Sequence, residues 1–147
     1  MKRVADDQRP AGLNARVTHL SRNTQWRNEN ILVIRLKRAY ELPARSDGCR
    51  VLVDRLWPRG VSKAELSIQS WPKPLAPSTL LRKWFNHNPA RWTEFKDRYF
   101  RELDGRGDVA SLLEELANEE IVTLVFAARD VKYNHAKALK EYIERHV

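Results

Sequence analysis

The chain has 147 residues, 42% of them hydrophobic, a length and composition that suit one compact domain with a buried core rather than several domains. Its 27 lysines and arginines outnumber 19 acidic residues, and the net charge of +8 favours anionic partners such as phosphates, nucleic acid or acidic metabolites. The single cysteine, Cys49, excludes an intrachain disulfide framework, and no window approaches the ~18 to 20 apolar residues of a membrane helix. We therefore expect a soluble cytoplasmic protein without a membrane partner.

The first 30 residues differ from the rest of the chain. They carry six lysines and arginines against three acidic residues, and they show neither helical nor strand periodicity. We interpret residues 1–30 as a flexible basic leader, disordered or loosely attached. The apolar patterns begin at Ile31, so we place a single α/β domain over residues 31–147.

Three apolar runs predict β-strands. The first starts at Ile31 and alternates as it leaves the core, and the second, CRVLVD at residues 49–54, follows an Asp47-Gly48 turn signal. The third run, IVTLVFAA at residues 121–128, has no charge, which is typical of a strand covered on both faces. The segment LSIQSW at residues 66–71 is a further short extended candidate.

Helix-capping residues mark where the predicted helices begin. Ser62 with Glu65 forms a capping box, and Asn88 before Pro89 opens a helix that runs to about Leu103. Further helices are expected after Ser78, Asp108 and Asn134. Their apolar stripes include Phe95, Tyr99, Leu103, Leu113, Leu116, Leu139 and Ile143. We predict an α/β fold, a small and mostly parallel sheet with helices packed on both faces.

Two predicted strand ends carry an aspartate beside an arginine, Asp54-Arg55 and Arg129-Asp130. Ligands of open α/β sheets bind at the carboxyl ends of the strands, where helix N-termini also converge. If these strands are parallel neighbours, both pairs share one cleft with the helix that opens at Asn134. Arginines and helix N-termini bind oxyanions, so this arrangement predicts a site for a small anionic ligand.

A structural interpretation of the same residues stays open, because aspartates and arginines at strand ends often form salt bridges that fix loops. Histidine titrates near neutrality, so His135 and His87 are candidates for acid–base chemistry, although isolated histidines are more often capping or core residues. No HExxH, GxxxxGK[ST] or GxGxxG motif occurs, and the scattered histidines and aspartates do not indicate a metal site. We expect neither a metal nor a cofactor, and we interpret Cys49 as a buried structural thiol.

Four motifs stand out along the chain, VDRLWPRG at residues 53–60, Trp84-Phe85-x-His87, Ala128-Arg129-Asp130 and Asn134-His135-Ala136. With these motifs the chain closely resembles the YeaO-like branch of the domain of unknown function 488 family, over residue 31 to the C-terminus. A broader branch of the family carries Cys-His-Arg where this chain has Asn134-His135-Ala136, so thiol chemistry is not expected here. The resemblance implies the fold and the candidate residues, but it implies no activity.

The leading hypothesis is therefore a protein that binds a small phosphate- or carboxylate-bearing ligand between residues 54–59 and 129–135. The predicted ligand-binding residues are Arg55, Trp57, Arg59, Gly60, His87, Arg129 and Asn134. An enzymatic extension of this hypothesis uses Asp54, Asp130 and His135 as acid–base groups. The alternative from another class is a nucleic-acid-binding module that uses the basic surface, with affinity that falls steeply as salt rises.

Overall fold

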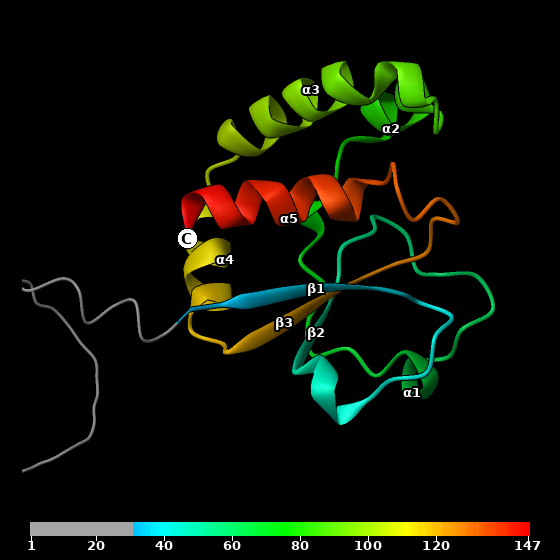
Figure 1. Ribbon diagram of the computed structural model, residues 1–147, viewed down its shortest axis with the longest axis vertical. Coiled ribbons are helices and arrows are strands. Elements are labelled where there is room, and N and C mark those ends of the chain that lie inside the picture. The colour runs from blue at the N-terminus through cyan, green and yellow to red at the C-terminus, as the bar shows by residue number, and fades with distance from the viewer. Residues whose placement is uncertain (1–30) are drawn as a thin grey trace, which may run out of the picture. The chain divides into compact units, whose positions relative to one another are not determined.

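The computed structural model describes residues 31–147 (Figure 1), and the predicted basic leader lies outside the described residues. Three strands are present, β1 (Val33–Arg38), β2 (Cys49–Leu52) and β3 (Ile121–Phe126). The α-helices are α1 (Lys63–Leu66), α2 (Thr79–Phe85), α3 (Trp92–Asp104), α4 (Val109–Ala117) and α5 (His135–His146). Short 3-10 helices are η2 (Arg45–Asp47), η3 (Lys73–Leu75) and η4 (Pro89–Arg91).

The three strands form one parallel sheet in the order β1-β3-β2. Val33 of β1 is opposite Ile121 of β3, and Cys49 of β2 is opposite Val122, so β3 lies in the centre. A central strand of a parallel sheet is covered on both faces, which is why β3 is buried from Val122 to Phe126 and carries no charge. The parallel α/β sheet predicted from the sequence is confirmed.

The strands end earlier than their sequence patterns indicated. β2 stops at Leu52 rather than at Asp54, and β3 stops at Phe126 rather than at Ala128. Val53 still donates its backbone N–H to Val125 at 3.0 Å, so the chain leaves the sheet just after this last bond. Residues 66–71 contribute a single parallel bridge between Ser70 and Val51, much less than a full strand.

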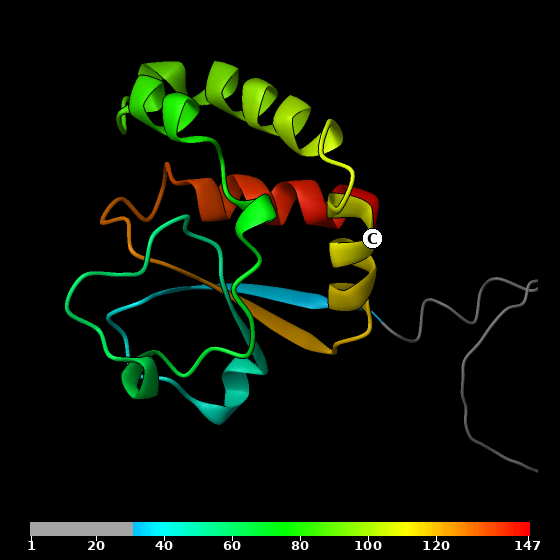
Figure 2. The ribbon, with the colours of Figure 1, turned by 180° about the vertical axis from the view of Figure 1, so that it is seen from behind.

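Helices α2 to α5 bury the larger hydrophobic core against one face of the sheet. In Figures 1 and 2, α5 lies directly over the strands and α3 lies beyond it. Phe85 of α2 stacks on Phe95 of α3 with ring centroids 4.3 Å apart, and the buried Tyr99 donates its hydroxyl hydrogen to the carbonyl of Leu75 at 2.5 Å. Burial of each such side chain contributes about 1.5 to 3 kcal/mol to the free energy of unfolding. Because the larger cluster lies on this face of the sheet, this face contributes most of that stabilisation.

The opposite face of the sheet carries a smaller cluster under α1 and its flanking loops. Leu52, Leu66 and Val125 are fully buried there, and the half-buried Trp57 and Trp71 pack against them. The two indole rings meet edge to face with centroids 5.5 Å apart. Both faces of the sheet are therefore covered, as predicted, but unequally.

The helix starts largely follow the predicted caps. Ser62 and Glu65 form the capping box of α1, and the side chains of Ser78 and Asn134 accept N–H groups at the starts of α2 and α5. The prediction for Asp108 was wrong in detail, because its side chain makes no capping hydrogen bond to α4. The helix predicted from Pro89 begins with one 3-10 turn, η4, before α3. Within residues 31–147, no helix is long and apolar enough to cross a membrane.

Candidate functional site

The loops that follow the three strands lie at the same edge of the sheet (Figures 1 and 2). We call the loops at residues 39–44, 53–62 and 127–134 the carboxyl edge. The sequence-based hypothesis of one shared cleft required β2 and β3 to be parallel neighbours, and they are. Helix α5 begins directly after the last of these loops, at His135.

Asp54 and His135 form the central contact of the carboxyl edge. His135 Nε2 lies 2.7 Å from Asp54 Oδ1, and the backbone N–H of Ala127 donates to Asp54 Oδ2 at 2.9 Å. The two side chains are only 12% and 14% exposed, so this contact is shielded from most of the solvent. Because a carboxylate accepts hydrogen bonds, Nε2 carries a proton and Nδ1 is left to accept or, in the imidazolium, to donate.

Asp130 and Asn134 hold the loop that leads into α5. Asp130 Oδ1 accepts the backbone N–H groups of Lys132 and Tyr133, and the buried Asn134 both donates to the Asp130 carbonyl and accepts the N–H of Lys137. The N–H groups of Tyr133 and Lys132 lower the pKa of the Asp130 carboxyl, which is therefore a poor proton donor. These contacts give Asp130 and Asn134 a structural role in shaping the edge.

The corner between α2 and η4 approaches this same loop. The ring centroid of Phe85 lies 5.9 Å from that of Trp92, and the Trp92 ring in turn meets Tyr133 edge to face at 5.6 Å. His87 is exposed and adopts a left-handed backbone with φ of 52°. Two motifs far apart in the sequence, Trp84-Phe85-x-His87 and residues 128–136, therefore meet at one end of the sheet.

Arg55 is bound to backbone carbonyls of the segment before α2. Its Nε and Nη2 donate to the carbonyls of Pro77 and Ala76 at 3.2 and 3.3 Å, and Arg106 donates to the same Ala76 carbonyl at 2.7 Å. The Arg55 guanidinium thus fixes the segment between η3 and α2. A structural role accounts for this arginine better than the anion-binding role predicted from the sequence.

The turn after β2 is built around Trp57 and Gly60. Trp57 Nε1 donates to the Val61 carbonyl at 2.7 Å, and Gly60 has φ of 79°, a conformation that favours glycine. Both residues shape the turn, and the Arg59 carbonyl accepts the Tyr40 hydroxyl at 3.1 Å. The Arg59 side chain is exposed at the outside of this turn.

Arg59 and Arg129 are the two predicted arginines that remain available. Both side chains are exposed, and within residues 31–147 neither takes part in a hydrogen bond or an ion pair. Asp54 Oδ2 is meanwhile occupied by the Ala127 N–H, and its Oδ1 by His135. Arg59 and Arg129 therefore contribute positive charge to the carboxyl edge that no described side chain pairs with.

Arg38 is a residue of this edge that was not predicted from the sequence. At the end of β1, its Nε and Nη2 donate to the carbonyls of Ala128 and Ala127 at 2.9 and 3.1 Å. Its guanidinium also lies over the Tyr40 ring, 5.1 Å from the centroid. Arg38 thereby fixes the start of the loop that carries Arg129. The signal was a basic residue at the end of an apolar strand, a pattern noticed only for the other two strands.

Asp47 was also missed, since the sequence indicated only a turn. The buried Asp47 accepts from Arg50 Nη1 at 2.7 Å and from Lys37 Nζ at 3.0 Å, and Ala44 donates its backbone N–H at 2.9 Å. Burial alone would raise the pKa of Asp47, but the hydrogen bonds from Ala44, Lys37 and Arg50 outweigh burial and lower it. This network lies before β2, at the opposite end of that strand from Asp54.

The residue types that could bind a metal do not form a cluster in the part of the chain that the structure describes. Over residues 31–147, no group of three or more histidines, cysteines, aspartates and glutamates is arranged to bind a metal ion. Cys49 is half-buried, and burial followed by the charge of Glu119 raises the pKa of its thiol. A thiol with a raised pKa is a weak nucleophile at neutral pH.

The fold and the carboxyl edge define a small α/β domain whose strand ends carry two exposed arginines and an aspartate–histidine pair. A family model described as the inactive DUF488-N3 subclade, DUF488-N3i, matches residues 33–147, and the chain belongs to this family.

Curated relatives cover most of the same region. The chain is 37% identical over 110 residues to the uncharacterized protein YeaO of Escherichia coli K12, a match that covers 75% of this chain and 96% of that protein. It is 41% identical over 110 residues to the uncharacterized protein Rv3073c of Mycobacterium tuberculosis H37Rv and to Mb3100c of Mycobacterium bovis, covering 75% of this chain and 92% of each relative. No solved structure matches the chain. The predicted resemblance to the YeaO-like branch is confirmed.

Proposed function

We propose that the protein binds a small anionic ligand, bearing phosphate or carboxylate, at the carboxyl edge without transforming it. Arg59 and Arg129 supply the positive charge, and the backbone N–H of His135 supplies a hydrogen bond from the first turn of α5. The observation that carries the proposal is the Asp54–His135 contact of 2.7 Å, because it joins the start of α5 to the loop that carries Arg59.

The start of α5 adds further donors to this proposal. Asn134 caps the helix by accepting the N–H of Lys137, whereas within residues 31–147 the N–H group of the partly exposed His135 has no partner. Free N–H groups in the first turn of a 12-residue helix attract anions, and the helix dipole reinforces them. Guanidinium and backbone N–H donors together suit an oxyanion.

Three observations favour binding over catalysis. The family is described as an inactive subclade. Asn134 stands at the position where a broader branch of the family carries the cysteine of Cys-His-Arg. In this chain, Asn134 is buried and caps α5. Backbone N–H groups of Tyr133 and Lys132 donate to Asp130 Oδ1 and lower the pKa of its carboxyl, so Asp130 is a poor proton donor. We assign Asp54 and His135 a positioning role, and the catalytic role considered from the sequence stays a prediction.

A thermal-shift screen of the purified full chain tests this proposal. The ligands are phosphate, sulfate, nucleotides, sugar phosphates and carboxylates, and a ligand at a hundredfold excess over its Kd stabilises the protein by about 2.7 kcal/mol. We expect one anion class to raise the melting temperature of the parent but not of an Arg59→Ala/Arg129→Ala variant. Arg45→Ala, which removes another exposed arginine, is the matched control and should respond as the parent does.

Two results contradict the proposal. If no anion shifts the parent, or if the variant responds as strongly as the parent, the two arginines do not form a binding site. A parallel titration with DNA and RNA addresses the nucleic-acid alternative, which predicts binding that weakens steeply between low and physiological salt and depends on many basic residues rather than on two.

A further inference from the structure

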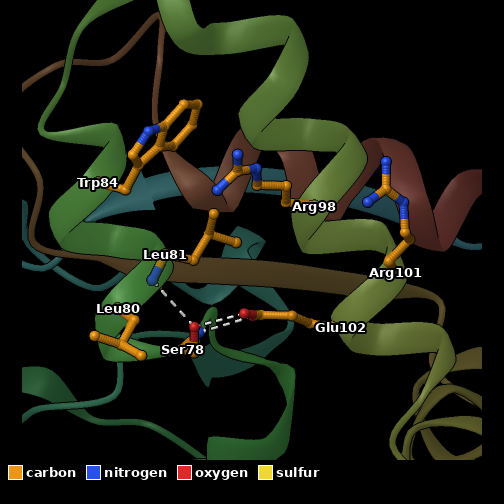
Figure 3. Close-up of a pocket in the computed structure, with 7 residues that line it drawn as sticks. All are labelled: Ser78, Leu80, Leu81, Trp84, Arg98, Arg101 and Glu102. Atoms are coloured by element: carbon orange, nitrogen blue, oxygen red, sulfur yellow. Dashed lines mark hydrogen bonds between the residues drawn. The ribbon is translucent and has the colours of Figure 1, made fainter.

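A groove between α2 and α3 lies apart from the carboxyl edge. Figure 3 shows its walls, with leucines and a tryptophan on the α2 side and charged residues on the α3 side. The cavity has a volume of about 440 Å³ and is lined by Ser78, Leu80, Leu81, Trp84, Arg98, Arg101 and Glu102. None of these residues belongs to the proposed anion site.

The α2 wall of the groove is apolar and partly unprotected. Leu81 is buried and contributes to the core, but Leu80 is 82% exposed on the rim. Trp84 is half-buried, with the guanidinium of Arg98 4.4 Å from its ring centroid and that of Arg91 5.1 Å from it. An exposed leucine beside a half-buried tryptophan is the kind of apolar surface that a partner covers.

The groove keeps a positive charge after the charged residues that pair with each other are set aside. Glu102 is fully engaged, because Ser78 donates its N–H at 2.9 Å and its hydroxyl at 2.5 Å, and Arg106 donates at 3.1 Å. Arg98 pairs with Glu94 on the same helix. Arg101 is exposed, and within residues 31–147 no side chain pairs with it. A group that complements this groove therefore carries a carboxylate for Arg101.

We propose that the α2–α3 groove docks an acidic amphipathic peptide segment of a partner protein. An apolar side chain of the segment lies on Leu80 and Trp84, and an acidic side chain pairs with Arg101. A groove between two helices is a common site for such segments. Two features favour a peptide over a small acid: Leu80 is 82% exposed on the rim, and the apolar α2 wall and the unpaired Arg101 lie on different helices, so one small group would not cover both. The basic composition of residues 1–30 does not complement the groove.

Selection from a random library of displayed dodecapeptides on the full chain tests this inference. Enriched peptides are synthesised with a fluorescent label and titrated by anisotropy against the parent and against Leu80→Ser/Arg101→Glu. Both altered side chains are exposed, so the fold is retained, which the urea midpoint verifies. The matched control, Leu42→Ser/Arg45→Glu, makes the same two changes at other exposed positions.

We expect the enriched sequences to combine Asp or Glu with Leu, Phe or Trp. Their affinity should fall at least about tenfold for the groove variant and stay unchanged for the control. The inference is overturned if no sequence is enriched, if the enriched peptides are basic, or if they bind the groove variant as tightly as the parent. Loss of affinity in Arg59→Ala/Arg129→Ala instead would assign the peptides to the carboxyl edge and also overturn it.

Discussion

His135 Nε2 lies 2.7 Å from Asp54 Oδ1, although 81 positions separate these two residues in the sequence. The contact joins the end of β2 to the start of α5, and the Ala127 N–H adds the end of β3 to the same carboxylate. One aspartate therefore connects three elements at the edge where ligands of parallel α/β sheets bind.

Replacement of Asp54 by alanine should destabilise the protein. The change leaves the Ala127 N–H and the His135 imidazole without their acceptor in a largely shielded position, which costs about 1 to 3 kcal/mol. Urea unfolding measures the loss. In the Asp54→Ala background, a further His135→Ala change should cost less than it does in the parent, because the shared interaction is already gone. Fully additive effects would contradict the coupling of the two residues.

The Asp47 network should make stability fall in acid. The pKa of Asp47 lies below its ordinary value of 3.8 in the folded protein, so the unfolded chain takes up this proton first as the pH falls. The stabilisation is complete above that ordinary value and is lost as the pH drops through the lower folded pKa. Urea midpoints measured from pH 6 to pH 2 should therefore show a steeper acid decline in the parent than in Asp47→Asn.

At neutral pH, Asp47→Ala leaves the buried Arg50 guanidinium without its carboxylate, and we expect a loss of about 3 to 5 kcal/mol. Asp97→Ala, which removes an exposed carboxylate from α3, is the control and should change stability by less than about 0.5 kcal/mol. Equal effects of the two substitutions would mean that the Asp47–Arg50 pair contributes nothing.

Two glycines with positive φ should respond differently to alanine. Gly60, with φ of 79°, has nothing within 4 Å of the position of an added methyl group, so Gly60→Ala costs only the backbone strain of about 1 to 2 kcal/mol. At Gly48, with φ of 63°, the methyl carbon would lie 2.5 Å from the Ile121 carbonyl oxygen. We expect Gly48→Ala to cost clearly more in thermal unfolding, and a cost no greater than that of Gly60→Ala would contradict the described turn before β2.

Replacement of Arg55 and of Arg59, two arginines of the same loop, should affect stability differently. Arg55→Ala removes hydrogen bonds to two backbone carbonyls, and we expect a loss of about 1.5 to 3 kcal/mol. Arg59→Ala should change stability by less than about 0.5 kcal/mol, because its side chain is exposed and unpaired among the described residues. Chemical unfolding checks both variants. A destabilised Arg59→Ala protein with an unaffected Arg55→Ala protein would reverse these roles.

Local sequence signals predicted much of this fold. The charge-free run at residues 121–128 indicated a strand covered on both faces, and β3 is the central strand. The capping residues Ser62, Ser78 and Asn134 act within three positions of themselves, so their signals are visible without the tertiary structure. Where a strand ends depends instead on where its hydrogen bonds to the neighbouring strand stop. The local sequence does not show this, and β2 and β3 were therefore predicted too long.

The candidate site was predicted less completely, because its contacts join residues far apart in the chain. The sequence indicated that Asp54 follows a strand and that His135 begins a helix. It did not indicate that the two side chains lie within hydrogen-bonding distance of each other. It also could not show that Arg55 turns to the carbonyls of residues 76 and 77, or that Arg38 reaches the loop after β3. Those partners become neighbours only once the order β1-β3-β2 is known.

The most direct test of anion binding at the carboxyl edge is a titration of the isotope-labelled full chain with inorganic phosphate, followed through backbone amide resonances. We expect saturable shifts that are largest at Arg129 and His135 and absent in Arg59→Ala/Arg129→Ala. Shifts spread over the basic surface without saturation, or shifts at these amides that persist in the variant, would contradict it.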